Sequence, residues 1–178
     1  GAAGLLPAFI AAAKELEDEG VCAITTTCGF LCLFLEELAR AVSVPVMTSS
    51  LLQVAGINAL LPKGKRAGVL TISANSLTDT HLGAAGVPLN TPIGAPTGHF
   101  AQVILGDLAE MDVEQAQADN VAAALALVAK HADIGAIVLE CTNMTPYAQA
   151  ISRAVNLPVF SIVCYVNWLQ SSVLPKRF

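Results

Sequence analysis

The sequence predicts an α/β fold with two pseudo-symmetric lobes, each a parallel sheet flanked by helices, and an active site in the cleft between them. Three observations lead to this prediction. Apolar segments of strand length alternate with segments of helical periodicity, which is typical of parallel sheets covered by helices. The strand segments carry few charges, as strands buried on both faces do. One strand, turn and helix pattern occurs twice at a fixed spacing.

Helical and extended segments can be assigned along the chain from periodicity and from Gly, Pro and capping residues. The segment 5–19 has one apolar face and is stopped by Gly20. In the first half we expect helix 5–19, strand 21–25, a helix from 31, strand 44–48 and helix 51–61. In the second half we expect strand 67–72, helix 76–85, a weak strand within 87–98, helix 112–130, strand 134–139, a helix from Thr145, strand 159–163 and helix 166–174.

A shift of 113 residues brings two blocks of the chain into register. It aligns Gly20–Cys28 with Asp133–Cys141, so that the two terminal cysteines coincide. The same shift carries Val44–Thr48 onto Leu157–Ser161, and each of these Pro-Val segments precedes a helix. Because one offset fits both blocks without a gap, we predict two lobes related by an approximate two-fold axis.

The two copies of the repeat differ in what precedes them. The second copy begins with the strand 67–72, for which the first copy has no counterpart before Cys28. We therefore expect a matching strand and loop of the first lobe upstream of the present sequence.

Charge and hydropathy limit the kinds of partner. The formal net charge is -5 and the main basic group is Lys63, Lys65 and Arg66, so neither nucleic acid nor a membrane is expected as a partner. A small-molecule substrate is the expected partner, and a dimer or higher homo-oligomer is left open. No apolar run reaches about 18 residues, the length that a membrane-spanning helix needs. The odd count of five cysteines favours reduced thiols and a cytoplasmic location.

Cys28 and Cys141 are the candidate catalytic residues. Each follows a predicted strand and precedes a helix, and ligands of parallel α/β sheets bind beyond this end of the strands. Helix N-termini favour a thiolate there. Two thiols on opposite sides of one carbon can remove its proton and return it on the other face, which inverts the centre. We expect Cys22, Cys32 and Cys164 to be packing residues, and no metal site, because Cys28 and Cys32 lack further ligands at suitable spacing.

Polar groups around the two cysteines are the candidate substrate contacts. Backbone N–H groups at these strand ends can stabilise the enolate-like charge that forms when a proton leaves carbon. Hydroxyl and amide side chains can hold substrate oxygens, and Ser49 and Ser50 are expected either to cap a helix or to line the cleft. The predicted substrate-binding residues are Thr26, Thr27, Gly29, Ser49, Ser50, Thr142 and Asn143.

Three motifs resemble the aspartate/glutamate racemase superfamily, which includes hydantoin racemases and related decarboxylases and isomerases. The motifs are Thr25–Phe30, Val44–Ser50 and Glu140–Met144. The resemblance implies a two-lobe α/β fold, catalysis without a cofactor, and a substrate held between two cysteines that match Cys28 and Cys141. It also implies that the chain crosses between the lobes near 62–66 and that the final helix packs back on the first lobe. The first lobe is then expected to span 1–62, joined by 164–178, and the second to span 63–163. Amino-acid racemases of this kind typically have Asn-Thr after the first cysteine, where this chain has Gly29 and Phe30. The resemblance therefore implies a less polar or bulkier substrate than free aspartate or glutamate.

Three functional hypotheses follow. The first is a cofactor-independent racemase or epimerase, an isomerase that acts on a small carboxylate or hydantoin-like carbon acid by two-base proton transfer through Cys28 and Cys141. The second is a decarboxylase or cis-trans isomerase of a small diacid that uses one essential cysteine. The third is a non-catalytic protein that binds a small molecule.

Overall fold

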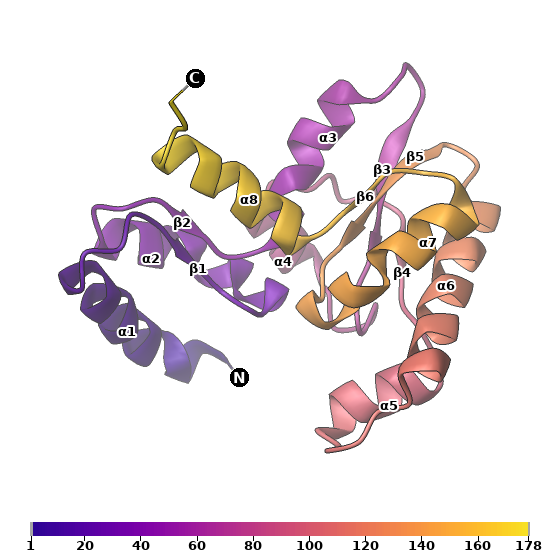
Figure 1. Cartoon of the computed structure of the whole chain (residues 1–178), viewed down its shortest axis with the longest axis horizontal. Coiled ribbons are helices and arrows are strands. Elements are labelled where there is room, and N and C mark those ends of the chain that lie inside the picture. Colours follow the sequence, from indigo (N-terminus) through magenta and orange to yellow (C-terminus); the bar gives the residue numbers. More distant parts are fainter. Residues whose placement is uncertain (1, 178) are drawn as a thin grey trace.

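The computed structural model describes residues 2–177 and has an α/β fold with two lobes, each built on a parallel sheet (Figure 1). The larger lobe contains a four-stranded sheet, and the smaller lobe contains a two-stranded sheet. Helices flank both sheets, so the predicted fold class is confirmed. No helix among the described residues is long and apolar enough to cross a membrane.

Four parallel strands form the larger sheet. They are β3 (Arg66–Leu70), β4 (Ile93–Gly94), β5 (Ile134–Leu139) and β6 (Val159–Phe160). They lie in the order β4-β3-β5-β6, and every neighbouring pair is parallel. The inner strands β3 and β5 are almost entirely buried, which explains why both read as uninterrupted apolar runs.

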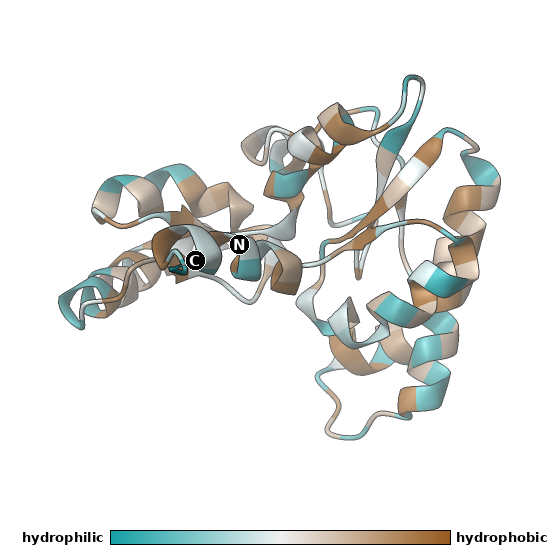
Figure 2. Cartoon of the chain, turned by 45° about the horizontal axis from the view of Figure 1, so that its top comes forward, coloured by the Kyte–Doolittle hydropathy of each residue, from teal (hydrophilic) through white to brown (hydrophobic). Residues whose placement is uncertain are grey.

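Helices cover both faces of the larger sheet. One face carries α5 (His99–Gly106), α6 (Val113–Lys130) and α7 (Ala148–Val155), and the other carries α3 (Val54–Leu60) and α4 (Asp79–Ala84). Because successive strand residues point to opposite faces, Ile137 and Leu139 join the first core, and Ala136 and Val138 join the second. Figure 2 shows the result as apolar strands with polar residues on the outer sides of α6 and α7.

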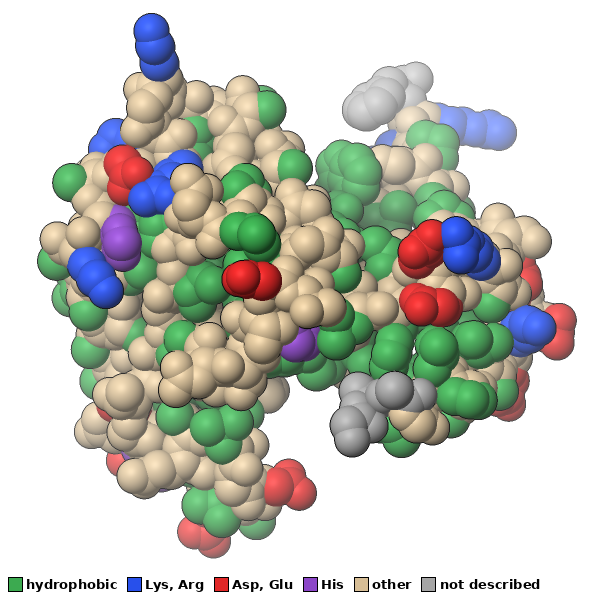
Figure 3. Space-filling view, turned by 180° about the vertical axis from the view of Figure 1, so that it is seen from behind, with side chains coloured by type: hydrophobic (Ala, Val, Ile, Leu, Met, Phe, Trp, Pro, Cys, Tyr) green, Lys and Arg blue, Asp and Glu red, His purple; other side chains and the backbone are tan. Residues whose placement is uncertain are grey.

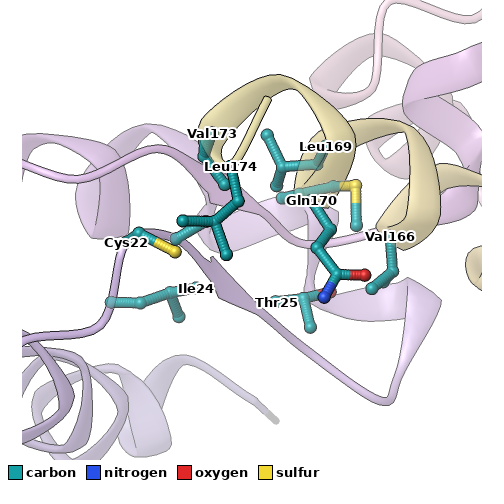
Figure 4. A pocket seen from close by; sticks show the side chains of 10 residues that line it. Cys22, Ile24, Thr25, Val166, Leu169, Gln170, Val173 and Leu174 are labelled. Atoms are coloured by element: carbon teal, nitrogen blue, oxygen red, sulfur yellow. The ribbon is translucent and has the colours of Figure 1, made fainter. Parts of the chain in front are cut away.

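The smaller lobe pairs β1 (Ile24–Thr25) with β2 (Val46–Met47) and carries α1 (Leu6–Asp18), preceded by the 3-10 helix η1 (Ala2–Leu5), and α2 (Leu35–Ala41). Its buried core residues are Ala13, Ile24, Phe34 and Leu38. The C-terminal helix α8 (Ile162–Val173) returns from the larger lobe and lies over this sheet (Figure 1). Its side chains and those of β1 line a cavity of about 270 Å³, in which Leu174 points toward Cys22 and Ile24 (Figure 4).

The sequence repeat corresponds to repeated structure. The partners Ile24↔Val46 and Thr25↔Met47 of the smaller sheet recur as Ile137↔Val159 and Val138↔Phe160 in the larger sheet, each residue 113 positions later. The 3-10 helices η2 (Gly29–Phe34) and η4 (Thr142–Tyr147) begin and end at the same offset. Each follows one of the two candidate cysteines, so the predicted equivalence of Cys28 and Cys141 is confirmed.

Helix starts in the second half differ from the predictions at four places. α4 begins at Asp79, three residues later than the helix predicted over 76–85, because Thr78 is its N-cap. No helix is expected from the sequence where α5 lies, because the preceding Gly/Pro-rich stretch hides its start at Gly98, which has φ +94°. The N-cap predicted at Thr145 is wrong, because the helical turn already starts at Thr142. α8 begins four residues earlier than predicted, where Ser161 forms a capping box with Cys164.

The packing of two helices bears on the lobe boundaries. α3 and the 3-10 helix before it, η3 (Ser50–Gln53), contribute Leu51, Val54 and Ile57 to a core shared with β3 and β5. The core of the larger sheet therefore includes residues that precede position 63. The division into 1–62 with 164–178 and 63–163 stays a prediction.

Removal of side-chain volume from the centre of β5 should weaken the whole larger lobe. Ile137 is fully buried, so Ile137→Ala is expected to lower the free energy of unfolding by about 2–5 kcal/mol through lost burial and a cavity. The control is Leu125 of α6, which is 46% exposed. Leu125→Ala should change the free energy of unfolding by less than about 0.5 kcal/mol. Urea unfolding followed by circular dichroism measures both, and equal losses would contradict this account of the core.

Candidate active site

A cavity of about 200 Å³ lies between the lobes and contains both candidate cysteines. In the smaller lobe its wall comes from the start of η2. In the larger lobe its walls come from the segments that follow β3 and β5, from α5 and from the start of η4. The lining residues are Thr27, Cys28, Gly29, Phe30, Ile72, Ile104, Glu140, Cys141, Thr142 and Asn143. Figure 3 shows the two lobes as separate masses with hollows between them. The two thiols therefore share one cavity, as predicted from the repeat.

The two cysteines occupy equivalent backbone positions. Each is the N-cap of a 3-10 helix, and its carbonyl accepts a hydrogen bond from the N–H three residues later, at 3.0 Å for Leu31 on Cys28 and 3.1 Å for Met144 on Cys141. The thiol of Cys28 is exposed, whereas Cys141 is buried with 8% exposure. Equivalent turns thus bring both cysteines to the cleft, but Cys28 is in contact with water and Cys141 is largely shielded from it.

Hydrogen bonds between the strand ends hold the lobes together at the cavity. The Thr142 hydroxyl donates to the Thr27 carbonyl at 2.7 Å, which links the residues that flank the two cysteines. Within the larger lobe, the Ser50 hydroxyl at the start of η3 donates to the carbonyl of Leu139, the last residue of β5. These contacts join the two copies of the repeat directly.

The predicted substrate-binding residues divide into two groups. Thr27, Gly29, Thr142 and Asn143 line the cavity with the cysteines. Thr26, Ser49 and Ser50 do not appear among its described lining residues. The Thr26 hydroxyl donates to the Thr48 carbonyl at 2.6 Å, and the Ser49 hydroxyl caps η3 by accepting from the Leu51 N–H at 3.2 Å. The hydroxyls of this second group therefore form hydrogen bonds with backbone groups of the protein instead of lining the cavity.

Glu140 is the ionisable lining residue of this cavity that the sequence analysis did not select as a site residue. It is 1% exposed, and one carboxylate oxygen, Oε2, accepts a hydrogen bond from the Thr71 hydroxyl at 2.7 Å. Its other oxygen, Oε1, is buried and has no hydrogen-bond partner within residues 2–177. The available signal was its position before Cys141 at the end of an apolar strand, since a buried carboxylate needs a partner or a function.

The carboxyl of Glu140 lies against Gly29 of the other lobe. A Cβ atom at residue 29 would overlap Oε1 and would lie 2.6 Å from the Glu140 carbonyl oxygen and 2.8 Å from its Cδ. Only a residue without a side chain fits at this distance. The Glu140 carboxyl therefore explains why a glycine follows Cys28, because it occupies the space that a side chain at residue 29 would need.

The ionisable groups of the cavity are shifted mainly by burial. Burial raises the pKa of the Glu140 carboxyl to about 7, although the hydrogen bond from Thr71 lowers it. Burial raises the pKa of the Cys141 thiol to about 11, backbone hydrogen bonds from Asn143 lower it, and the charges of Glu140 and Cys28 raise it further. Burial and the Glu140 charge likewise raise the pKa of Cys32 to about 11.

The other three cysteines differ from one another. Cys32 is buried and packs in the core of α3 and α4, as expected. Cys22 and Cys164 are exposed, so the prediction that they are packing residues is wrong for both. Their strands are only two residues long and leave Cys22 before β1 and Cys164 inside α8. Among the described residues, no group of three His, Cys, Asp or Glu side chains could hold a metal ion.

Comparison with known proteins places this architecture in a family. Residues 2–165 match the family described as Asp/Glu/Hydantoin racemase. This matched segment includes both halves of the repeat and both cysteines. The chain belongs to the Asp/Glu/hydantoin racemase family. Membership of this family of enzymes supports a racemase-like enzyme and agrees with the resemblance of the three sequence motifs.

Curated relatives of this family member are named as lyases. The chain is 33% identical over 96% of its length to dimethylsulfoniopropionate lyase 3 of Emiliania huxleyi, and it covers 47% of that protein. It is 28% identical over 83% of its length to a dimethylsulfoniopropionate lyase of Durusdinium sp. clade D, of which it covers 51%. The chain thus spans about half the length of the curated relatives that it matches.

Solved structures share the two-lobe fold. Arylmalonate decarboxylase superposes with a TM-score of 0.62 at 14% identity, over 100% of this chain and 78% of the decarboxylase. A glutamate racemase of Bacillus anthracis superposes with a TM-score of 0.53 at 17% identity, over 95% of this chain and 67% of the racemase. At these identities the similarity establishes the fold alone.

Substitution of the glycine beside the carboxyl should disturb the cavity. Gly29→Ala places Cβ against the Glu140 carboxyl and carbonyl, and overpacking of this kind is expected to destabilise the chain by about 1–3 kcal/mol. Gly56→Ala in α3 is the control, because a Cβ there meets no atom within 4 Å and alanine is the better helix former. Thermal unfolding should show a lower Tm for Gly29→Ala and an equal or higher Tm for Gly56→Ala. Equal Tm values would show that the two lobes are not held at this distance.

The raised pKa of Cys141 predicts slow alkylation at neutral pH. Since the thiolate is the reactive form and the pKa is about 11, iodoacetamide should label Cys141 increasingly from pH 7 to above 10. In urea-unfolded chain the same cysteine should react at lower pH, because burial no longer disfavours its thiolate. Peptide mass spectrometry measures both profiles. Matching profiles in the folded and unfolded chain would contradict the assigned environment.

Proposed function

We propose that this chain is a cofactor-independent enzyme that transfers a proton at the carbon next to the carboxylate of a small acid. Cys28 and Cys141 are the proposed proton-transferring groups, in the manner of a racemase or epimerase that uses two bases. The supporting observation is that equivalent turns of the repeat bring both thiols to one cavity. Family membership supports the same class of chemistry.

The proposed reaction begins when the thiolate of one cysteine takes the proton from carbon. The electron pair of the broken C–H bond is delocalised into the neighbouring carboxylate, and backbone N–H groups at Thr142 and Asn143 stabilise the charge that develops. The thiol of the other cysteine returns a proton on the opposite face. Burial raises the pKa of Cys141, so it is the protonated partner near neutral pH, and the first abstraction is proposed for the exposed Cys28.

A second candidate is β-elimination, and the curated relatives favour it. These proteins are named dimethylsulfoniopropionate lyases and match more than four fifths of the chain. Elimination shares its first step with racemisation: a thiolate takes the proton on the carbon beside the carboxylate. The C–H electron pair then forms the C=C bond, and the C–S electron pair leaves with dimethyl sulfide. Such a lyase needs one thiolate base and no proton on the second face.

Hydrogen exchange separates these candidates. Substrate is incubated with the chain in D2O, using hydantoins, small carboxylates and dimethylsulfoniopropionate, and NMR follows the hydrogen on carbon, inversion and dimethyl sulfide release. A two-base racemase should incorporate deuterium with inversion, and Cys28→Ser and Cys141→Ser should each reduce inversion by about 10²–10⁴-fold. The control Cys22→Ser, outside this cavity, should keep full activity.

The other outcomes identify the alternatives. Dimethyl sulfide release that depends on one cysteine alone would assign the lyase reaction, and carbon dioxide release or geometric isomerisation of a diacid would assign the remaining single-thiol reactions. Ligand binding with no exchange and no product would indicate a binding protein. Full activity in both serine variants would refute the proposal.

A further inference from the structure

An apolar groove lies outside the shared cavity, where α8 passes η3 and α3 (Figure 1). Its volume is about 380 Å³. The lining residues are Leu52, Gln53, Gly56, Ile57, Leu60, Phe160, Cys164, Tyr165 and Trp168. These described residues include no Asp, Glu, Lys, Arg or His, and none of them lines the cavity of the two thiols. The proposed reaction therefore does not account for the groove.

Large apolar side chains of this face are in contact with water. Leu60 is 82% exposed and Trp168 is 60% exposed. α8 has no charged residue along its twelve positions, and yet none of its residues is buried. α3 also lacks charged residues. Helices without charge are normally covered, and exposed apolar patches of this kind mark interaction surfaces.

The groove is fixed in shape within one chain. The side-chain N–H group of Gln53 donates to the Ser161 carbonyl at 3.1 Å, which ties η3 to the start of α8. The ring of Trp168 stacks on that of Tyr165, with centroids 5.4 Å apart and an interplanar angle of 27°. A side chain that is already held in place loses little conformational entropy when a partner covers it. The face thus offers a preformed groove with an ordered aromatic side chain beside it.

The two sides of the groove are equivalent in the repeat. The 113-residue offset carries η3 and α3, which together span 50–60, onto 163–173, which is α8 from its second residue onward. Leu52 thereby corresponds to Tyr165, and both residues line the groove. The midpoint between two residues related by a two-fold axis lies on that axis. The predicted approximate axis of the chain therefore passes through this face.

A second copy of the chain is the partner that this face fits. In an interface about a two-fold axis, the same patch occurs on both sides, so a protruding residue and the groove that receives it must share one face. Trp168 and the groove meet this requirement. A charge close to such an axis would be repelled by its own counterpart, so an uncharged surface suits self-association. An unrelated partner would be oriented by charged groups, which the described lining residues lack.

We propose that two copies of the chain associate about a two-fold axis through η3, α3 and α8. Trp168 of each copy enters the groove of the other, and Leu60 of each copy is covered. A specific interface buries about 1,000 Å² or more in total, and one aromatic side chain buries about 150–250 Å². The exposed parts of Trp168 and Leu60 occur twice and each covers groove surface on the other copy, so this face reaches that size.

Sedimentation velocity over a series of protein concentrations tests the interface. The unmodified chain should form a species of twice its 18.4 kDa mass and dissociate on dilution. Trp168→Glu and Leu60→Glu should each raise the dissociation constant at least about 30-fold, since each places two like charges in one apolar interface. The control Leu89→Glu changes a leucine that is 61% exposed and outside the groove, and it should leave the constant within about twofold. Circular dichroism verifies that the variants are folded.

Cross-linking identifies the face that the dimer uses. Cys164 is exposed and lines the groove, so a long bismaleimide should join Cys164 of one copy to Cys164 of the other. Cys164→Ser should abolish the linked dimer. Cys22→Ser should retain it, although Cys22 is also exposed. Peptide mass spectrometry identifies the joined residues.

Each outcome supports or overturns the interface independently of the proposed reaction, because groove and cavity have no described lining residue in common. Concentration-dependent dimers that Trp168→Glu and Leu60→Glu dissociate, together with the Cys164 link, would support it. A monomer at every concentration would overturn it and leave the groove to a different occupant. Dimers that withstand both groove variants, that Leu89→Glu weakens equally, or that are linked through another cysteine would overturn it as well.

Discussion

The close approach of the Glu140 carboxyl to Gly29 determines how the two lobes meet. It joins the residue before one cysteine to the residue after the other, so the separation of the lobes at the cavity is set by the contact of a carboxyl with a bare Cα. The hydrogen bond from Thr142 to Thr27 connects the same two loops. Both thiols therefore depend on one small area of contact, and the larger sheet serves as the rigid support behind it.

Much of the fold could be predicted because the chain is strongly patterned. β5 was predicted at its observed bounds, since six successive residues are apolar or glycine between polar turns. The N-cap of α6 was also predicted, since Asp112 accepts from the N–H groups of Glu114 and Gln115. α5 was missed because the Gly and Pro residues before it mask its start. The two-residue strands β1, β2 and β6 were predicted too long because β-propensity does not show where pairing ends.

The candidate site was predictable where the repeat fixed it and not elsewhere. The coincidence of Cys28 with Cys141 placed both thiols correctly in one cavity. Glu140 begins one of the three motifs that resemble the family, but its contact with Gly29 crosses two lobes and more than a hundred residues, so no local pattern reveals it. Ser49 and Ser50 were grouped with the substrate contacts because they follow a strand, yet the hydroxyl of each engages backbone instead.

The 113-residue offset also pairs Thr27 with Glu140, the residues that immediately precede the two cysteines. If these positions were identical, a cleft with approximate two-fold symmetry would accept a molecule equally well in either of two orientations. The hydroxyl of Thr27 on one side and the carboxyl of Glu140 on the other make the two orientations different. A duplicated scaffold thus acquires a defined direction, and the two chemically similar thiols become distinguishable to whatever occupies the space between them.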